Sequence, residues 1–170
     1  NVERFGHSST GPFRGMKADA WEGGHRVPFV VRWPGEVQPG TVSEQLVCFT
    51  DLVATCTAVA GIAAPPSTGE DSVSFLPVLR GDGAATRTTL VLKANASVVR
   101  DGVWKLIRHR GSGGFSAPRR GPKSDPPGQR YRLYRDPGES NNLWHSHPEI
   151  VRRLEALSRD VRKSAAERKR

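Results

Sequence analysis

The sequence predicts an α/β protein in which part of a larger domain is followed by a smaller α+β unit. Three observations support this prediction. Residues 27–33 form a continuous apolar run that is rich in β-branched and aromatic side chains, which is typical of a buried strand. A helical pattern follows at residues 50–61. Three strand-like runs between residues 89 and 109 then precede an amphipathic helix near the end of the chain.

The first predicted segment, residues 1–88, opens with a long glycine-rich loop over residues 1–26, including one short helical turn near residues 18–21. The apolar strand at residues 27–33 follows this loop and ends at Pro34-Gly35. We expect it to be a central strand whose partners precede this chain. In the isolated chain its free edge would favour aggregation.

A helix is predicted after a short strand at residues 45–49. Thr50 or Asp51 can cap this helix, because a short polar side chain accepts a hydrogen bond from the free N–H groups of the first turn. Gly61 suits the left-handed residue that ends a helix. A turn or one-turn helix at residues 73–81 then completes the segment.

The second predicted segment, residues 89–170, contains an antiparallel sheet and one packing helix. Its strands are expected at residues 89–94, 96–101, 103–109 and 131–135. Asp101-Gly102 predicts a tight turn between the second and third strands. Pro148 suits a first helical turn, and the apolar residues that follow it form one stripe at helical spacing.

The formal net charge of +9 is concentrated in two regions. Residues 108–135 hold eight basic residues against one acid, and residues 152–170 hold eight against three. Such runs are usually solvated faces. No zinc-finger, helix-turn-helix or RNP-like pattern supports nucleic-acid binding, whereas a preference for anionic substrates fits the charge.

Cys48 and Cys56 form neither a CxxC motif nor a disulfide framework, so both are predicted to be small buried residues. No run of residues is long and apolar enough to span a bilayer. The first residue is not Met, and we expect any targeting segment to lie upstream. The cellular compartment and the oligomeric state therefore stay open.

Residues 11–35, GPFRGMKADAWEGGHRVPFVVRWPG, place a lysine in a glycine-lined loop ahead of the apolar strand. Glycines allow backbone conformations and close approaches that a side chain would block. Lys17 would present a compact cation with three donors, which suits a tetrahedral oxyanion, and Arg26 would be buried behind it. These residues alone predict contact with an anion, although a single loop lysine is more often only solvated.

The same stretch resembles the signature of the sulfatase family, G-x-x-R-G-x-K-x-x-x-[WY]-E-G-G-x-R-x-P, which an apolar strand and W-P-G follow. The matching positions are Gly11, Arg14, Gly15, Lys17, Trp21, Glu22, Gly23, Gly24, Arg26, Pro28, Trp33, Pro34 and Gly35. Later segments resemble the family in the same order: FTDLVATCTAVAG, SVSFLPVLRG, VVRDGVWKLI and LYRDPGESNNLWHSHPEIVRRLEAL. The resemblance therefore covers essentially the whole chain.

The resemblance implies an alkaline-phosphatase-like α/β fold with a smaller C-terminal sheet, and it implies hydrolysis of sulfate esters. In this family a Cys or Ser in a C/S-x-P-x-R motif becomes formylglycine, whose hydrate attacks sulfur. A divalent cation, usually calcium, is held by Asp and Asn and binds the sulfate. The implied partner is a sulfated small molecule or a sulfated polysaccharide, and the implied location is periplasmic or secreted.

Lys17 matches the family lysine that contacts sulfate, so the resemblance implies a catalytic and substrate-binding role for it. His7 and His25 lie in the same loop and are further substrate-binding candidates. The residues expected to shape the loop are Gly15, Trp21, Glu22, Gly23, Gly24 and Arg26. Neither Cys48 nor Cys56 stands in C-x-P-x-R, and the family's Asp pair and S-D-N-G segment are absent. The nucleophile and the calcium ligands are therefore expected upstream, with no metal ligand in this chain.

Two other function classes stay open. One is a phosphoryl-transfer or phosphonate hydrolase on the same superfold, and the other is a non-catalytic basic module that binds polyanions. The chain alone is expected to be inactive because it lacks the nucleophile. The basic loop at residues 111–130 is expected to be poorly ordered. Lys105 lies on a predicted strand, and its replacement by Ala is expected to leave the kinetics near normal.

Overall fold

The computed structural model describes residues 5–63, 68–83, 86–93 and 95–167, and the chain forms two compact units. One unit comprises Asn1–Pro28 and Leu90–Arg170, and the other comprises Phe29–Thr89. The N-terminal loop thus belongs to the same compact unit as the C-terminal sheet. The domain boundary at residue 88 stays a prediction. The elements are η2 (Glu22–Gly24), η3 (Phe49–Asp51), α1 (Leu52–Ala60), α2 (Leu76–Arg80), β1 (Thr89–Lys93), β2 (Ser97–Asp101), β3 (Trp104–Ile107), β4 (Gln129–Arg132) and α3 (Pro148–Glu167).

The sheet has the strand order β1-β2-β3-β4, and β2, β3 and β4 pair as antiparallel neighbours. Asp101 pairs with Trp104 across a tight turn in which Gly102 has φ +54°, as the Asp101-Gly102 step predicted. The last strand begins at Gln129 and ends at Arg132, earlier than the predicted residues 131–135. The reason is a turn in which the N–H of Arg135 donates to the carbonyl oxygen of Arg132 at 3.0 Å.

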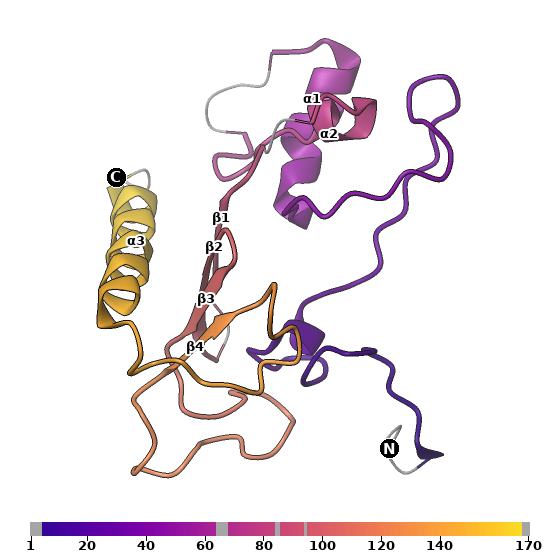
Figure 1. Ribbon diagram of the computed structural model, residues 1–170. Coiled ribbons are helices and arrows are strands. Elements are labelled where there is room, and N and C mark those ends of the chain that lie inside the picture. The colour runs from indigo at the N-terminus through magenta and orange to yellow at the C-terminus, as the bar shows by residue number, and fades with distance from the viewer. Residues whose placement is uncertain (1–4, 64–67, 84–85, 94, 168–170) are drawn as a thin grey trace. The chain divides into compact units, whose positions relative to one another are not determined.

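Both faces of this sheet are covered, because successive side chains of a strand point to opposite faces. On one face Val99 and Leu106 pack against Val151 and Leu154 of α3, which runs alongside the sheet (Figure 1). The other face packs against the N-terminal loop: Trp21 and Ala20 join Val98, Ile107, Tyr131 and Leu133. The predicted antiparallel sheet with one packing helix is confirmed, and the loop that carries Lys17 covers its second face.

In the other unit, α1 ends at Gly61 with φ +66°, as predicted. Asp51, one of the two predicted caps, stands at the N-cap position of α1, but its side chain does not make the predicted capping hydrogen bond. Its buried carboxylate accepts hydrogen bonds from the N–H of Cys48 (2.9 Å) and of Val73 (3.0 Å). It also forms an ion pair with Arg87, so Asp51 joins three segments of the unit instead of capping one helix.

The apolar run at residues 27–33 forms neither a helix nor a strand, and Val30 is 90% exposed. A strand needs a partner, and no described segment pairs with this run; its pairing with strands outside the chain stays a prediction. Residues 45–49 are likewise not a strand. Cys48 is half-buried and Cys56 is exposed, so the expectation that both are buried is wrong. Among the described helices, none is long and apolar enough to cross a membrane.

Candidate functional site

Lys17 lies in a tight turn. The N–H of Asp19 donates to the carbonyl oxygen of Met16 at 3.0 Å, and Ala18 has φ +74°. A positive φ at the third residue of a turn is type II geometry, which favours glycine and strains alanine. The turn exposes Lys17. Within the described ranges its ammonium has no hydrogen-bond or ion-pair partner, so its charge is available to a ligand.

Asp19 fixes this turn. Its side chain is buried, and Oδ2 accepts the N–H of Met16 at 2.8 Å. Its Oδ1 accepts the N–H groups of Phe115 (2.7 Å) and Ser116 (3.1 Å). Burial opposes ionisation, but the hydrogen bonds from Ser116, Met16 and Phe115 outweigh it and hold the pKa of Asp19 below its usual range. The carboxylate thus joins the Lys17 turn to a loop nearly a hundred residues away.

That loop is the basic segment expected to be poorly ordered, and the expectation is wrong for residues 111–119. The N–H of Ser112 donates to the carbonyl oxygen of Pro118 at 2.9 Å, and its hydroxyl donates to that of Ser116 at 2.6 Å. The side-chain amide of Gln129 donates to the carbonyl oxygen of Gly111 at 2.9 Å. A glycine-rich loop with little apolar surface is here held by polar contacts, which composition does not reveal.

At two positions of the loop, close backbone contacts leave room only for glycine. A Cβ at Gly24 would lie 2.0 Å from the carbonyl oxygen of Asp19, and one at Gly23 would lie 2.4 Å from that of Gly15. The N–H of Gly23 donates to the carbonyl oxygen of Arg14 at 2.8 Å, which closes the loop on itself. The expectation that glycines permit close approach is therefore met at these positions.

Trp21 anchors the loop in the core. Its ring is 1% exposed, and its Nε1–H donates to Oε1 of Gln129 at 2.9 Å. The hydroxyl of Tyr131 donates to the same oxygen at 2.7 Å, and burial raises the pKa of Tyr131 to about 12, so this hydroxyl stays a donor. The guanidinium of Arg14 lies 3.7 Å from the centroid of the Trp21 ring and donates to the carbonyl oxygen of Glu139 at 2.9 Å.

A buried ion cluster, formed by Lys105, Glu22 and Glu139, lies behind the loop. Lys105 Nζ is 2.9 Å from Oε1 of Glu22 and 2.8 Å from Oε1 of Glu139. All three side chains are at most 3% exposed. The second carboxylate oxygen of Glu139 accepts the backbone N–H of Glu22. Lys105 thus joins the loop, β3 and the connection after β4. Its predicted place on a strand is confirmed, and the near-normal kinetics expected of its Ala variant stay a prediction.

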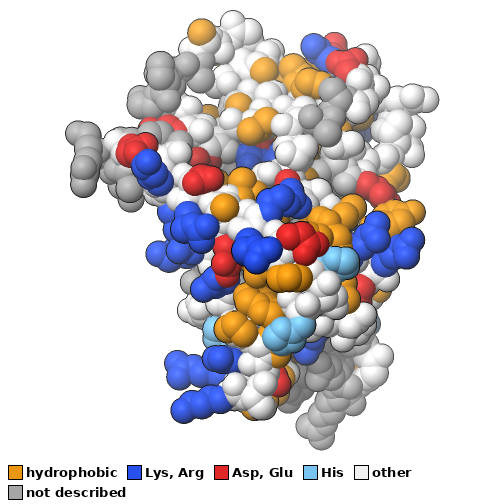
Figure 2. All heavy atoms as spheres, turned by 60° about the vertical axis from the view of Figure 1, so that its left-hand side comes forward, with side chains coloured by type: hydrophobic (Ala, Val, Ile, Leu, Met, Phe, Trp, Pro, Cys, Tyr) orange, Lys and Arg blue, Asp and Glu red, His pale blue; other side chains and the backbone are white. Residues whose placement is uncertain are grey.

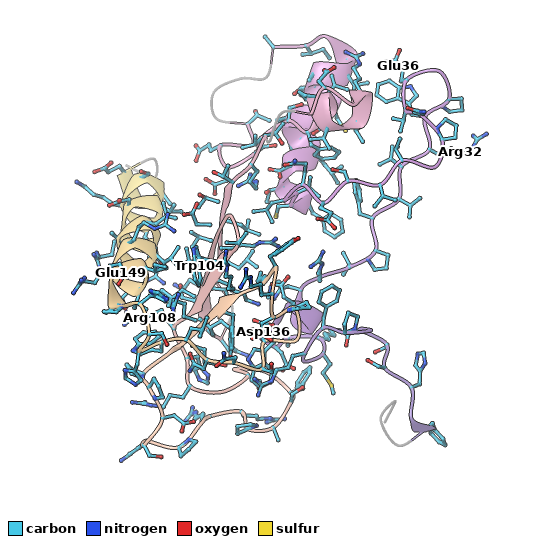
Figure 3. All side chains as sticks on the ribbon, viewed as in Figure 1. Arg32, Glu36, Trp104, Arg108, Asp136 and Glu149 are labelled. Atoms are coloured by element: carbon cyan, nitrogen blue, oxygen red, sulfur yellow. The ribbon has the colours of Figure 1, made fainter. Side chains whose placement is uncertain are left out.

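Glu139 reaches this cluster from the connection between β4 and α3, where Asp136 lies (Figure 3). The carboxylate of Asp136 accepts the N–H groups of Ser140 and Asn141, each at 2.9 Å. Glu139 has φ +50°, an uncommon conformation for a residue with a side chain. The turn is therefore held in a shape that directs Glu139 inward.

The pKa values of the two carboxylates of the ion cluster are shifted in opposite directions. Burial opposes ionisation of Glu22, but hydrogen bonds from His25 and the charge of Lys105 hold the pKa of Glu22 far below its usual range. For Glu139, burial dominates and raises its pKa, because Lys105 offsets burial only in part and the charge of Glu22 adds to it. The surroundings therefore favour the ionised form of Glu22 and disfavour that of Glu139.

The remaining candidates lie around this cluster or on the surface. Nε2 of His25 is 3.4 Å from Oε1 of Glu22, so His25 is brought to the ion cluster. Arg26 is half exposed, contrary to the expectation of burial; its guanidinium is 3.5 Å from Glu22 and 4.3 Å from the ring centroid of Phe13. His7 is exposed. Substrate contact by His7 and His25 stays a prediction.

The described residues hold no group of three or more His, Cys, Asp or Glu side chains that could bind a metal ion. The arrangement instead offers one exposed ammonium on a turn that hydrogen bonds and buried charges hold in place. Such a group can bind an anion and neutralise charge on it.

Comparisons with known proteins identify the family of the chain. Residues 17–109 match the family model described as "N-sulphoglucosamine sulphohydrolase, C-terminal". The chain is 33% identical to an N-acetylgalactosamine-6-O-sulfatase of Bacteroides thetaiotaomicron, over 92% of this chain and 31% of that protein. It is 32% identical to steryl-sulfatase of Mus musculus, over 92% of this chain and 29% of that protein. The chain thus spans about a third of the length of these relatives.

The fold is similar as well. A solved Bacteroides thetaiotaomicron 6S-sulfatase, described in the context of the metabolism of multiple glycosaminoglycans, superposes with a TM-score of 0.81 at 32% identity. The match covers 95% of this chain and 34% of that chain. The predicted fold, a C-terminal part of an alkaline-phosphatase-like α/β protein with its small antiparallel sheet, is thereby confirmed.

Proposed function

Since this chain belongs to the sulfatase family, we propose that the full-length protein hydrolyses sulfate esters and that Lys17 binds the sulfate group. The observation that carries this proposal is the position of Lys17 in the family's loop sequence, on a fixed turn, with an exposed ammonium that has no partner among the described residues. An unpaired cation held at a fixed position gains from a bound anion without first losing another partner.

The contribution of Lys17 is electrostatic. A sulfate monoester carries one negative charge, and charge grows on the leaving oxygen as the S–O bond breaks. A fixed ammonium beside the sulfate oxygens stabilises this charge more strongly in the transition state than in the ground state, and this difference is what accelerates a reaction. Asp19 and the ion cluster of Lys105, Glu22 and Glu139 act behind Lys17, because they keep its turn in one place.

The nucleophile and the divalent cation of the family would come from residues outside this chain. In sulfatases, formylglycine supplies the attacking oxygen and calcium binds the sulfate. The chain alone would then be inactive, because positioned charge does not replace the covalent step. A non-catalytic module would instead bind its polyanion without needing the rest of the protein.

The relatives indicate two classes of substrate. One relative is an N-acetylgalactosamine-6-O-sulfatase and another is a steryl-sulfatase, so both a sulfated sugar and a sulfated small molecule are consistent with the family. The basic surface of this chain favours an anionic polymer among these, and we propose a sulfated polysaccharide as the physiological substrate.

The test compares esters that differ only in the transferred group. The purified full-length protein would be assayed with 4-nitrophenyl sulfate and with 4-nitrophenyl phosphate. The proposal expects turnover of the sulfate ester at a kcat/KM well above that of the phosphate ester, and none with residues 1–170 alone. Preferred turnover of the phosphate ester would identify the phosphoryl-transfer alternative, and turnover of neither would favour the binding module.

A further inference from the structure

The loop tied to the Lys17 turn carries an exposed aromatic ring and a cation together. Phe115 is 59% exposed, and the guanidinium carbon of Arg119 lies 6.0 Å from the centroid of its ring. A single exposed apolar side chain is ordinary on a protein surface, so the feature that distinguishes Phe115 is the cation beside its ring. Arg110, Arg120 and Lys123 of the same segment are also exposed, and Asp125 is the only acid between residues 110 and 128.

The backbone of this loop is fixed relative to the Lys17 turn. The carboxylate of Asp19, two residues after Lys17, accepts the N–H groups of Phe115 and Ser116. Gly114 packs so closely on the turn that a Cβ there would lie 2.4 Å from the carbonyl oxygen of Ala18. The N–H of Ala20 also donates to the carbonyl oxygen of Ser112 at 2.8 Å. Phe115 and Lys17 are thus presented by two backbone segments in direct contact.

We propose that Phe115 and Arg119 form a subsite for an anionic sugar unit next to the one whose sulfate Lys17 binds. The inference rests on the proposed function, and it identifies the substrate as a chain of sulfated sugars. The C–H groups of a sugar ring carry slight positive charge and pack on the negative face of an aromatic ring. Arg119 beside the ring would pair with a sulfate or carboxylate of the same sugar.

The charge of the segment favours this occupant over an uncharged one. In Figure 2, Lys and Arg side chains stand at several places among hydrophobic and acidic side chains, and residues 110–128 hold four Lys or Arg against one acid. An anionic polymer is drawn to such a surface, and the attraction weakens as salt is added. A loop that is already fixed loses little conformational entropy when it binds a ligand. A contact of small area, such as that of one ring and one cation, can then contribute to affinity.

The experiment uses the full-length protein and two substrates, 4-nitrophenyl sulfate and a sulfated glycosaminoglycan tetrasaccharide. The variants are Phe115→Ala and Arg119→Gln. For each, the ratio of kcat/KM on the tetrasaccharide to kcat/KM on the aryl sulfate is expected to fall roughly 3- to 10-fold, as for the loss of one stacking or charge contact. Binding of the tetrasaccharide, measured by calorimetry, should weaken by a similar factor.

Matched controls are Tyr134→Ala, an exposed ring that is 80% accessible, and Arg159→Gln on the exposed face of α3. Both should keep the substrate ratio and the affinity of the wild type. If Phe115→Ala instead lowers the melting temperature and leaves the ratio unchanged, the ring is covered by other parts of the polypeptide and the subsite does not exist. If Arg119→Gln leaves both the substrate ratio and the affinity for the tetrasaccharide unchanged, Arg119 makes no charge contact with the sugar.

The two proposals fail separately. If the wild type hydrolyses the aryl sulfate but does not bind the tetrasaccharide, the subsite is wrong and the proposed function stands. If the wild type binds the tetrasaccharide and Phe115→Ala weakens this binding, but neither ester is hydrolysed, the subsite stands and the sulfatase activity is wrong. Absence of both activity and binding contradicts both.

Discussion

Two lysines of this chain have opposite surroundings. Lys17 is exposed on a tight turn and has no partner among the residues that the structure describes, whereas Lys105 is fully buried between two carboxylates. A buried ammonium is tolerated only when opposite charges compensate for its lost hydration. An exposed ammonium keeps its hydration and needs no compensating charge, so it can bind a ligand. The comparison separates a lysine that holds the site in place from one that is available for chemistry.

The two environments are only a few residues apart along the loop. Met16 to Asp19 form the turn that presents Lys17, and Glu22 begins the segment whose carboxylate pairs with Lys105. One short segment therefore presents a cation on one side and is fixed by a buried ion cluster on the other. Changes at the buried side should act mainly on stability, and changes at the exposed side mainly on catalysis.

The largest effect on stability is expected for Lys105→Met. This change leaves the carboxylates of Glu22 and Glu139 buried without their shared cation, and losing one partner of a buried ion pair costs about 3–5 kcal/mol. Chemical denaturation of the full-length protein would measure it. Lys93→Met, on the exposed end of β1, is the control and should change stability little. Equal effects of the two substitutions would mean that the ion cluster does not stabilise the loop.

Gly24→Ala should have the next largest effect. Its Cβ would lie 2.0 Å from the carbonyl oxygen of Asp19, and backbone has to shift to relieve such a contact, which costs about 1–3 kcal/mol. Gly138→Ala is the matched control, because its nearest atom would be 3.3 Å away. Thermal unfolding of both variants would compare them. A Gly24→Ala variant that is as stable as Gly138→Ala would contradict the close packing of the loop.

The two carboxylates of the ion cluster should respond to pH in opposite directions. The pKa of Glu22 is lowered from an ordinary value of 4.5, so its contribution is present above that pH and is lost on acidification. The pKa of Glu139 is raised, so its contribution is full below 4.5 and declines as pH rises through the raised value.

Glu22→Gln should therefore be more destabilising at pH 7 than Glu139→Gln, by about 1–2 kcal/mol. Relative to the wild type, Glu22→Gln should lose stability as pH rises from about 3 to 5, and Glu139→Gln should gain stability as pH rises above about 5. Melting temperatures over this range would measure both. Parallel curves for the two variants would show that the carboxylates are equivalent.

The smallest effect is expected for Ala18→Gly. Glycine adopts the φ of +74° without the strain that alanine has there, so the variant should be more stable by about 1 kcal/mol or less. Ala20→Gly, at a buried position of ordinary φ in the same loop, should be less stable than the wild type. If both substitutions destabilise equally, the turn around Lys17 is not strained.

Local sequence signals predicted the elements that depend on local chemistry. Pro148 and the apolar stripe after it predicted α3, and Asp101-Gly102 predicted the turn between β2 and β3. Residues 27–33 have the composition of a strand but form none in this chain, because pairing depends on a partner and not on composition. The helix-capping role of Asp51 failed for a similar reason, since its partners are distant in sequence.

The candidate site was predictable at Lys17 and in its glycines, because a long motif contains them. The buried partners were missed, since Lys105 and Glu139 are 83 and 117 residues from Glu22 and no local pattern connects them. Glu22, Lys105 and Glu139 each stand in a segment that resembles the family, but nothing in the sequence places these segments in contact. Asp19, which joins the turn to Phe115, had no signal in the sequence either.

The central claim is that Lys17, and not Lys105, is the lysine that acts on substrate, and replacing Lys17 by Ala tests it most directly. In the full-length protein with a sulfate ester as substrate, Lys17→Ala should lower kcat/KM by about 10²–10³, with a decrease in kcat and not only a rise in KM. Lys17→Arg should recover little, because a planar guanidinium does not reproduce a point charge on a tight turn. The exposed Lys93→Ala should remain near the wild type, and all variants should keep its melting temperature. Wild-type kcat/KM in Lys17→Ala would show that this residue is only a solvated loop lysine and would contradict the account.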